Sequence, residues 1–479
     1  MNTGLELGAA EMRALGTAAV EWMVRYYSTL PERRVMPDTT SRHIRALVDE
    51  PLPQGGSDAA RLLEIVENCI VPLSRQNGHP RFFGYVGSPG TAITSIGDLL
   101  ASTLNANVTS WRSAPGPAEI ERVAVNWIKE ILGYPQEAAG LFVSGGSMAN
   151  LSGLAAARSR YAPDCVQAGL GSQPRLRIYV SEEGHFSIRK AAGLLGIGQD
   201  HVRTIRTDEQ FRIDLGDLER CIEEDRAAGY VPASIVANAG AVATGAFDPI
   251  EELAAIARRH GMWLHVDGAY GGFAALAGSA RPLFRGISEA DSVSLDPHKW
   301  LYVSMGCGCV LYRDPAAASR AFGYQAEYTR PLGLESDEAF AFWDYGPELS
   351  RRFRALNVWL LIKYAGARAL SAAIERNIAC AKHLERLVEA APDFEMLAPV
   401  GLSIACFRYV PPRFTGDLDA LNERVLIELQ RQGRSYVSNA RPKGRFALRA
   451  CIVNYRTTEQ DVEILLEDVR RAAAVVLAS

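Results

Sequence analysis

The chain alternates short apolar runs with helical patterns, and this alternation constrains its fold more than any other feature. Four runs have the length and apolar character of buried strands: residues 177–180, 234–237, 263–266 and 292–295. Between the second and third runs, Asp248, Pro249 and Glu251 match the start of a helix that Asp248 caps. A strand, a capped helix and a strand in succession predict parallel βαβ units, with helices on both faces of one sheet.

The two ends of the chain have different patterns. Met12, Leu15, Ala19, Trp22 and Tyr26 recur at steps of three and four, which makes one face of a helix apolar. Such a face must be buried, either on a second subunit or on the rest of the same chain. From residue 351, a long helical stretch and then strand, helix and strand patterns predict a smaller α/β unit. We therefore expect a helical arm over 1–80, a large α/β domain over 81–350 and a small α/β domain over 351–479.

Composition excludes several classes of protein. With 48% hydrophobic and 22% charged residues, the chain is typical of globular proteins. Its net charge of −4 gives no electrostatic basis for binding nucleic acid or an anionic membrane. No run of 18 apolar residues is present, and Glu6 and Glu11 stand where a signal peptide would be basic. The eight cysteines include no CxxC pair, and the histidine spacing matches no zinc site. We expect a cytoplasmic protein with reduced thiols and no metal site.

The first candidate binding residues follow the apolar pair Phe142 and Val143. In parallel sheets, ligands bind beyond the carboxyl ends of the strands. Here Gly145, Gly146 and Ser147 lead into a predicted helix. Glycines let the backbone approach an anion, and the first N–H groups of a helix are unpaired. The segment favours a phosphate site, although a turn of this kind often binds nothing.

Two further candidates follow predicted strands. Asp267 comes directly after the strand at 263–266, where a carboxylate is costly unless a cation or a strong donor meets it. The small residues Gly268 and Ala269 beside it would let a flat group lie close. His185 follows the strand at 177–180 and could stack on a flat ring. Taken alone, each is more often a turn residue or a solvated side chain.

Lys299 is the fourth candidate. It lies in the segment Asp296-Pro297-His298-Lys299-Trp300, just after the strand at 292–295, with apolar residues beyond it. A lysine in an enclosed site can act as an amine nucleophile in Schiff-base chemistry. We interpret the other five lysines as surface residues: Lys129, Lys190, Lys363, Lys382 and Lys443.

A phosphate cradle, a carboxylate, a stacking ring and an enclosed lysine are what pyridoxal 5′-phosphate (PLP) requires. The lysine holds its aldehyde, and the carboxylate keeps the pyridine nitrogen protonated, so that the ring accepts electrons. His185 can stack on one face of the ring and Ala269 can pack on the other. The order and placement of these residues favour a PLP enzyme.

The sequence resembles the PLP-dependent group II amino acid decarboxylases, the aromatic amino acid and glutamate decarboxylase group. The resemblance covers nearly the whole chain and is carried by six segments: 79–85, 144–147, 183–185, 265–272, 296–300 and 350–356. It implies the aspartate aminotransferase-like fold (PLP fold type I), with a mainly parallel central sheet, an N-terminal helical arm and a small C-terminal α/β domain. It also implies a homodimer with shared active sites and the arm at the interface.

The resemblance assigns roles to individual residues. Lys299 is implied as the Schiff-base lysine, Asp267 as the pyridinium partner and His185 as the stacking ring. The implied cofactor contacts are Gly146, Ser147, His185, Asp267, Ala269, His298 and Lys299. Tyr328 corresponds to the family's loop tyrosine, the expected proton donor to the substrate carbon, so the implied catalytic residues are Lys299, His185, Tyr328 and Asp267.

Two positions depart from the family pattern. Ala241 follows Gly240 where many members have threonine, so one polar contact near the cofactor ring is absent. Asp296 stands where some members have asparagine. Because a carboxylate beside a phosphate dianion is unfavourable, we expect no direct contact between Asp296 and the phosphate.

The expected reaction is decarboxylation of an aromatic L-amino acid, such as tyrosine, dihydroxyphenylalanine or tryptophan. The expected substrate contacts are Tyr85, Val86, Ser88, Trp111 and Arg112. The alternative substrates are acidic (glutamate, aspartate or cysteine sulfinate), because Arg112 could pair with a second carboxylate. Val86, Asn107 and Thr109 are also smaller or more polar than the residues of aromatic-specific members. An aldehyde synthase and an aminotransferase are alternative reactions on this fold, although Tyr328 together with His185 argues against the aldehyde synthase.

Overall fold

The computed structural model describes residues 5–324 and 338–478. Its centre is a seven-stranded sheet in the order β2-β8-β7-β6-β5-β3-β4. The strands are β2 (Ala139–Val143), β3 (Leu176–Ser181), β4 (Val202–Ile205), β5 (Val231–Asn238), β6 (Trp263–Gly268), β7 (Ser292–Leu295) and β8 (Gly308–Tyr312). Only β8 runs against its neighbours, so the sheet is mainly parallel. The four strands predicted from apolar runs are all present, in β3, β5, β6 and β7.

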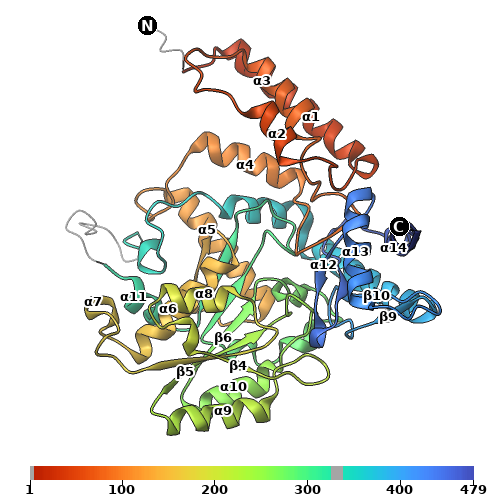
Figure 1. The fold of residues 1–479 in the computed structure, drawn as a ribbon. Coiled ribbons are helices and arrows are strands. Elements are labelled where there is room, and N and C mark those ends of the chain that lie inside the picture. Colours follow the sequence, from red (N-terminus) through yellow and green to blue (C-terminus); the bar gives the residue numbers. More distant parts are fainter. Residues whose placement is uncertain (1–4, 325–337, 479) are drawn as a thin grey trace.

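Helices cover both faces of this sheet, as the βαβ pattern predicts (Figure 1). On one side lie α6 (Gly146–Tyr161) and α8 (Ser187–Leu194), and on the other lie α9 (Leu215–Ala227) and α10 (Ile250–His260). The remaining helices of this part of the chain are α4 (Ala92–Leu104), α5 (Pro115–Leu132), α7 (Cys165–Ala168) and α11 (Pro315–Phe322). The core between sheet and helices is aliphatic and aromatic, with Trp263, Phe142 and Tyr179 fully buried.

The predicted cap of α10 is wrong in its detail. Pro249 occupies the N-cap position, and no side chain caps the helix. The Asp248 carboxylate instead accepts hydrogen bonds from the backbone N–H groups of Ile213 and Asn238, both at 2.7 Å. Burial raises the pKa of Asp248 to about 6. The carboxylate therefore joins a neighbouring loop to the end of β5.

A second, smaller sheet has the order β1-β11-β12-β10-β9. It contains β9 (Phe394–Met396), β10 (Ile404–Tyr409), β11 (Tyr436–Ala440) and β12 (Ala447–Cys451), with β1 (Phe82–Phe83) parallel to β11 at its edge. The helices α12 (Ala355–Ala390), α13 (Leu418–Gln432) and α14 (Glu459–Ala478) pack with it. Gly366, at φ 72°, breaks the helical path inside α12.

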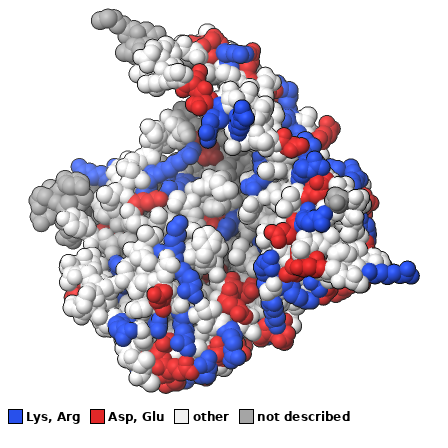
Figure 2. All heavy atoms as spheres, in the orientation of Figure 1, with Lys and Arg blue, Asp and Glu red and all other residues white. Residues whose placement is uncertain are grey.

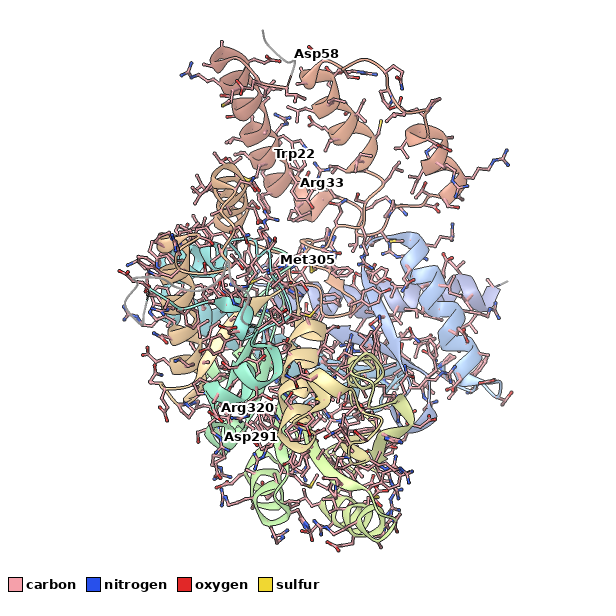
Figure 3. All side chains as sticks on the ribbon, turned by 90° about the vertical axis from the view of Figure 1, so that its left-hand side faces the viewer. Trp22, Arg33, Asp58, Asp291, Met305 and Arg320 are labelled. Carbon is pink, nitrogen blue, oxygen red and sulfur yellow. The ribbon has the colours of Figure 1, made fainter. Side chains whose placement is uncertain are left out.

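The N-terminal helices form an arm that projects from the body (Figure 1). They are α1 (Ala9–Thr29), α2 (Ser41–Val48) and α3 (Ala59–Ile65), and none of them has a buried residue. The arm is tied to the body near its base, where the hydroxyls of Tyr27 and Ser95 lie 3.2 Å apart. Figure 3 shows Trp22 and Asp58 on the arm, well away from the central sheet.

The face of the molecule drawn in Figure 2 shows no strong charge asymmetry. Acidic and basic side chains are interspersed on the face drawn in Figure 2, in keeping with the small net charge. None of the helices within residues 5–324 and 338–478 has the length and hydropathy needed to cross a lipid bilayer.

Candidate active site

A cavity of about 360 Å³ collects residues from the ends of several strands of the large sheet. Its volume is in the range of small-molecule sites. All seven predicted cofactor contacts line it: Gly146, Ser147, His185, Asp267, Ala269, His298 and Lys299. Asn150, Asn238, Tyr270 and Asp296 also line it and were not predicted as contacts.

The phosphate cradle is formed where β2 leads into α6. A Cβ atom on Gly146 would lie 2.7 Å from Asp296 Oδ2 and 2.8 Å from the Cβ of Ala269, so no side chain fits at this position. The backbone is therefore open toward the cavity. The first N–H groups of α6 have no acceptor within the helix, and the helix dipole favours an anion there. These residues fit the phosphate group of PLP.

Asp267 ends β6 and is almost fully buried. Three donors meet its carboxylate: the Asn150 amide at 2.8 Å, the Ala269 backbone N–H at 3.1 Å and the Ser294 hydroxyl at 3.3 Å. The three donors fix the position of the Asp267 carboxylate at the cavity, where a partner for a pyridine nitrogen was predicted.

His185 lies just before α8, and its ring orientation is fixed by Ser187. The Ser187 hydroxyl lies 2.8 Å from His185 Nδ1, and the Ser187 backbone N–H points at the same nitrogen at 3.3 Å. Because Nδ1 accepts from these donors, the proton of the neutral ring is assigned to Nε2. Burial lowers the pKa of His185, and the nearby Asp267 partly opposes this shift. The ring is therefore neutral, with an N–H available at Nε2.

Asn150 joins these two residues, and sequence reasoning missed it. Its amide nitrogen donates to Ser187 at 2.9 Å and to Asp267, while its oxygen accepts from His265 Nε2 at 2.9 Å. The available signal was its spacing, since Asn150 lies four residues after Gly146 and therefore on the same helix face. The chain of hydrogen bonds links the stacking ring to the carboxylate.

Lys299 is partly buried, and its Nζ lies 3.0 Å from Asp296 Oδ2. It is the only lysine among the described residues that line the cavity. The prediction that the other lysines are surface residues is wrong for Lys129, which is 3% exposed. Its ammonium donates to the carbonyl oxygens of Gln136 and Ala138. Because these acceptors satisfy the ammonium, Lys129 can be buried although it lies on a helix with many charged residues.

The predicted substrate contacts lie outside the lining of this cavity in the single chain. Tyr85 is 53% exposed and has φ 54°, Trp111 is partly buried, and Arg112 is exposed. Val86 is partly buried and Ser88 is buried. Tyr328 lies outside the described residues. The roles of these residues stay predictions.

Arg449 in β12 is a second residue that sequence reasoning missed. It is 3% exposed, donates to the carbonyl oxygens of Tyr85 and Ala243, and has an Nη2 without a hydrogen-bond partner among the described residues. Ala243 follows the cavity residue Val242 in the chain. A lone arginine in an apolar strand was the available signal, because buried charges usually have a specific partner.

Comparison with known proteins decides the family. The model of the pyridoxal-dependent decarboxylase conserved domain matches residues 41–410. The chain belongs to this family. It is 35% identical to the aromatic-L-amino-acid decarboxylase of Bacillus atrophaeus, over all of this chain and 99% of the relative.

Solved structures agree with the family at the level of the fold. Catharanthus roseus tryptophan decarboxylase in complex with L-tryptophan matches with a TM-score of 0.90 and 28% identity, over 98% of this chain and 99% of that chain. Oryza sativa TDC with PLP and tryptamine matches with a TM-score of 0.92 and 27% identity, over 98% of both chains. The pyridoxal-dependent decarboxylase described here therefore has PLP fold type I, uses PLP and is a carboxy-lyase.

Proposed function

We propose that the enzyme decarboxylates an aromatic L-amino acid, such as tyrosine, dihydroxyphenylalanine or tryptophan, to its amine and carbon dioxide. The observation that carries this proposal is the full-length similarity to an aromatic-L-amino-acid decarboxylase. In the single chain, the aromatic contacts Tyr85 and Trp111 lie outside the lining of the cavity, as does Arg112, on which the acidic alternative depends. The two substrate classes are therefore separated by the kinetic test.

Each residue of the cavity has a proposed role. When bound, PLP would supply a protonated ring able to accept the electron pair of the Cα–carboxylate bond as carbon dioxide leaves. Asp267, with its three donors, would keep a proton on the ring nitrogen. Lys299 would hold the cofactor through its amine, and Gly146, Ser147 and His298 would bind the phosphate. His185 would stack on the ring, and Ala269 would pack on the opposite face.

The last step is delivery of a proton to the substrate Cα. We assign it to Tyr328, with the Nε2 proton of His185 as a relay. A neutral imidazole suits this role, because it can donate at Nε2 while Ser187 holds Nδ1. A proton delivered promptly to Cα yields the amine and prevents the oxidation that would give an aldehyde.

We also propose a homodimer whose active sites contain residues of both subunits. The arm supports this assembly. A groove of about 510 Å³ between α1 and α3 is lined mainly by apolar side chains, including Leu15, Trp22 and Leu63. Met12, Val20 and Val24 on α1 are also exposed. We propose residues 1–80 as the dimerisation arm, 81–350 as the cofactor domain and 351–479 as the small domain.

We further propose that the enzyme works in the cytoplasm. All eight cysteines are free, and seven of them are buried. Buried, unpaired thiols are typical of proteins that stay in a reducing compartment.

The test of the substrate is a comparison of kcat/KM for L-tyrosine, L-tryptophan and L-glutamate, with identification of the released amine. If the substrate is aromatic, we expect one of the aromatic substrates to exceed glutamate by at least about 100-fold, because a second carboxylate is costly to bury without a cationic partner. The Arg112→Ala variant should keep this preference, as should Arg368→Ala, which removes another exposed arginine. A preference for glutamate that disappears in Arg112→Ala alone would replace the aromatic assignment with the acidic one.

A further inference from the structure

Asp296 is an acidic side chain in the cavity where the phosphate of PLP, itself an anion, is proposed to bind. It is 2% exposed, and its Oδ2 lies 3.0 Å from Lys299 Nζ and 3.7 Å from His298 Nε2. Its Oδ1 is buried and has no hydrogen-bond partner among the described residues. Half of the carboxylate is therefore paired with Lys299, and the other half is unpaired beside the cavity that it lines.

The carboxylate lies against the start of α6. A Cβ on Gly145 would lie 3.9 Å from Asp296 Oδ1, and one on Gly146 would lie 2.7 Å from Oδ2. This is the place where unpaired N–H groups and the helix dipole favour a negative charge. Asp296 therefore already places one negative charge where the phosphate of PLP has to bind.

Asp296 has no evident structural task that would explain its burial. Its side chain pairs with Lys299 and His298 and accepts no hydrogen bond from the backbone among the described residues. Asparagine has the same size and shape, so replacement by asparagine removes the charge without leaving a cavity. The negative charge is therefore the property by which Asp296 differs from an asparagine at this position.

We propose that the Asp296 carboxylate is a fixed negative charge that competes with the phosphate of PLP for the start of α6. By doing so it lowers the affinity of this enzyme for phosphorylated ligands. The proposal rests on the proposed function only in placing the phosphate at Gly146 and Ser147. Lys299 at 3.0 Å offsets part of the charge of Asp296, so the carboxylate should weaken the binding of a phosphate at this helix start by about 10- to 100-fold, the effect of a screened interaction between charges a few ångströms apart.

The test measures binding of two probes to the protein freed of cofactor. Pyridoxine phosphate and pyridoxine differ only in the phosphate, and neither has the aldehyde that would react with Lys299. In titrations followed by calorimetry, Asp296→Asn should bind pyridoxine phosphate about 10- to 100-fold more tightly than the native protein does. Its affinity for pyridoxine should stay within about threefold, because the repulsion acts on the phosphate.

Asp291→Asn is the matched control. Asp291 directly precedes β7 and Asp296 directly follows it, so the two buried acids lie at opposite ends of one strand. Asp291 pairs with Arg313 and lies outside the cavity lining; Figure 3 shows it in the lower part of the body. Asp291→Asn should leave the affinity for both probes unchanged.

Asp296→Ala separates loss of repulsion from gain of a donor. Alanine has no N–H in its side chain, so tighter binding of pyridoxine phosphate in both variants supports the proposal. Tightening in Asp296→Asn alone would assign the effect to the new amide and overturn the proposal, as would unchanged or weaker binding in both. No amino acid takes part in these measurements, so an error in the proposed substrate does not affect their outcome.

Discussion

At Asp267, three donors from different parts of the chain meet one carboxylate. Asp267→Asn keeps the shape of the side chain but removes the charge that holds a proton on the cofactor ring. We expect PLP to be partly retained, as measured by visible absorbance. We expect kcat to fall by about 10²–10³-fold, as after loss of one preorganised electrostatic group. Turnover comparable with that of the native enzyme would contradict this role for Asp267.

Tyr328 is tested by Tyr328→Phe, which fills the same space but cannot donate a proton. If Tyr328 protonates Cα, amine formation should fall by about 10²–10⁴-fold, the usual effect of a positioned general acid. Aldehyde and peroxide should then form in the presence of oxygen. Carbon dioxide, amine, aldehyde and peroxide are measured together on the variant. A near-native amine yield without aldehyde would leave His185 as the donor to examine.

The residues that the sequence predicted share one property: they come at or just after the end of a strand or at the first turn of a helix. Lys299 follows β7 and Asp267 is the last residue but one of β6, and in a parallel sheet such positions converge at one edge. Asn150, Ser187 and Arg449 were not predicted, although Ser187 begins α8 and the spacing of Asn150 was a weak signal. Their roles depend on side-chain contacts between residues far apart in the chain, such as Asn150 with Asp267, which no local pattern encodes.

Within β6, His265 makes folding sensitive to acid. It is fully buried, lies between Ser292 and Asn150, and burial lowers its pKa to about 4. The unfolded chain takes up a proton below about pH 6.5, whereas the folded protein stays neutral at this site until about pH 4. The free energy of unfolding should therefore fall by about 2–3 kcal/mol as the pH falls from 6.5 to 4.

Urea unfolding at pH 7.5 and pH 4.5 measures this effect. The variant His265→Gln should be less stable at pH 7.5 but should lose less stability on acidification than the native protein does. His79, whose pKa is also lowered to about 4 by burial, remains in the variant and keeps part of the acid sensitivity. Equal losses in the two proteins would remove His265 as the cause.

Helices and strands with a strong periodic pattern could be predicted from the sequence, but their first and last residues were predicted less well. β3, β5 and β6 extend beyond the predicted apolar runs, because backbone pairing with neighbouring strands continues past them. The pairing of β1 with β11 joins residues more than 350 positions apart and has no local signal. Asp248 matched a capping pattern, but burial and two backbone donors placed it in another role.

For the whole molecule, the arm should decide the oligomeric state. Val20 and Val24 lie four residues apart on α1 and are 47% and 54% exposed in the single chain. If this face packs against a partner, Val24→Glu would bury a charge and weaken the dimer at least about tenfold. Light scattering with size-exclusion chromatography at several concentrations measures the change.

Ile427→Glu is the matched control for the arm. Ile427 lies on α13 and is 62% exposed, so it offers a similar apolar side chain outside α1. This variant should remain a dimer. A native protein that is monomeric at all concentrations, or a Val24→Glu variant that dimerises as well as Ile427→Glu does, would contradict the proposed interface.

The central claim is that the cavity around Lys299 holds the cofactor, and covalent mapping tests it most directly. The protein is reduced with borohydride, which fixes bound pyridoxal to the lysine that carries it, and the modified peptide is identified by mass spectrometry. The chain has only six lysines, so the assignment has few alternatives. We predict that the pyridoxyl group is on Lys299. A stoichiometric pyridoxyl group on any of the other five lysines would contradict the account.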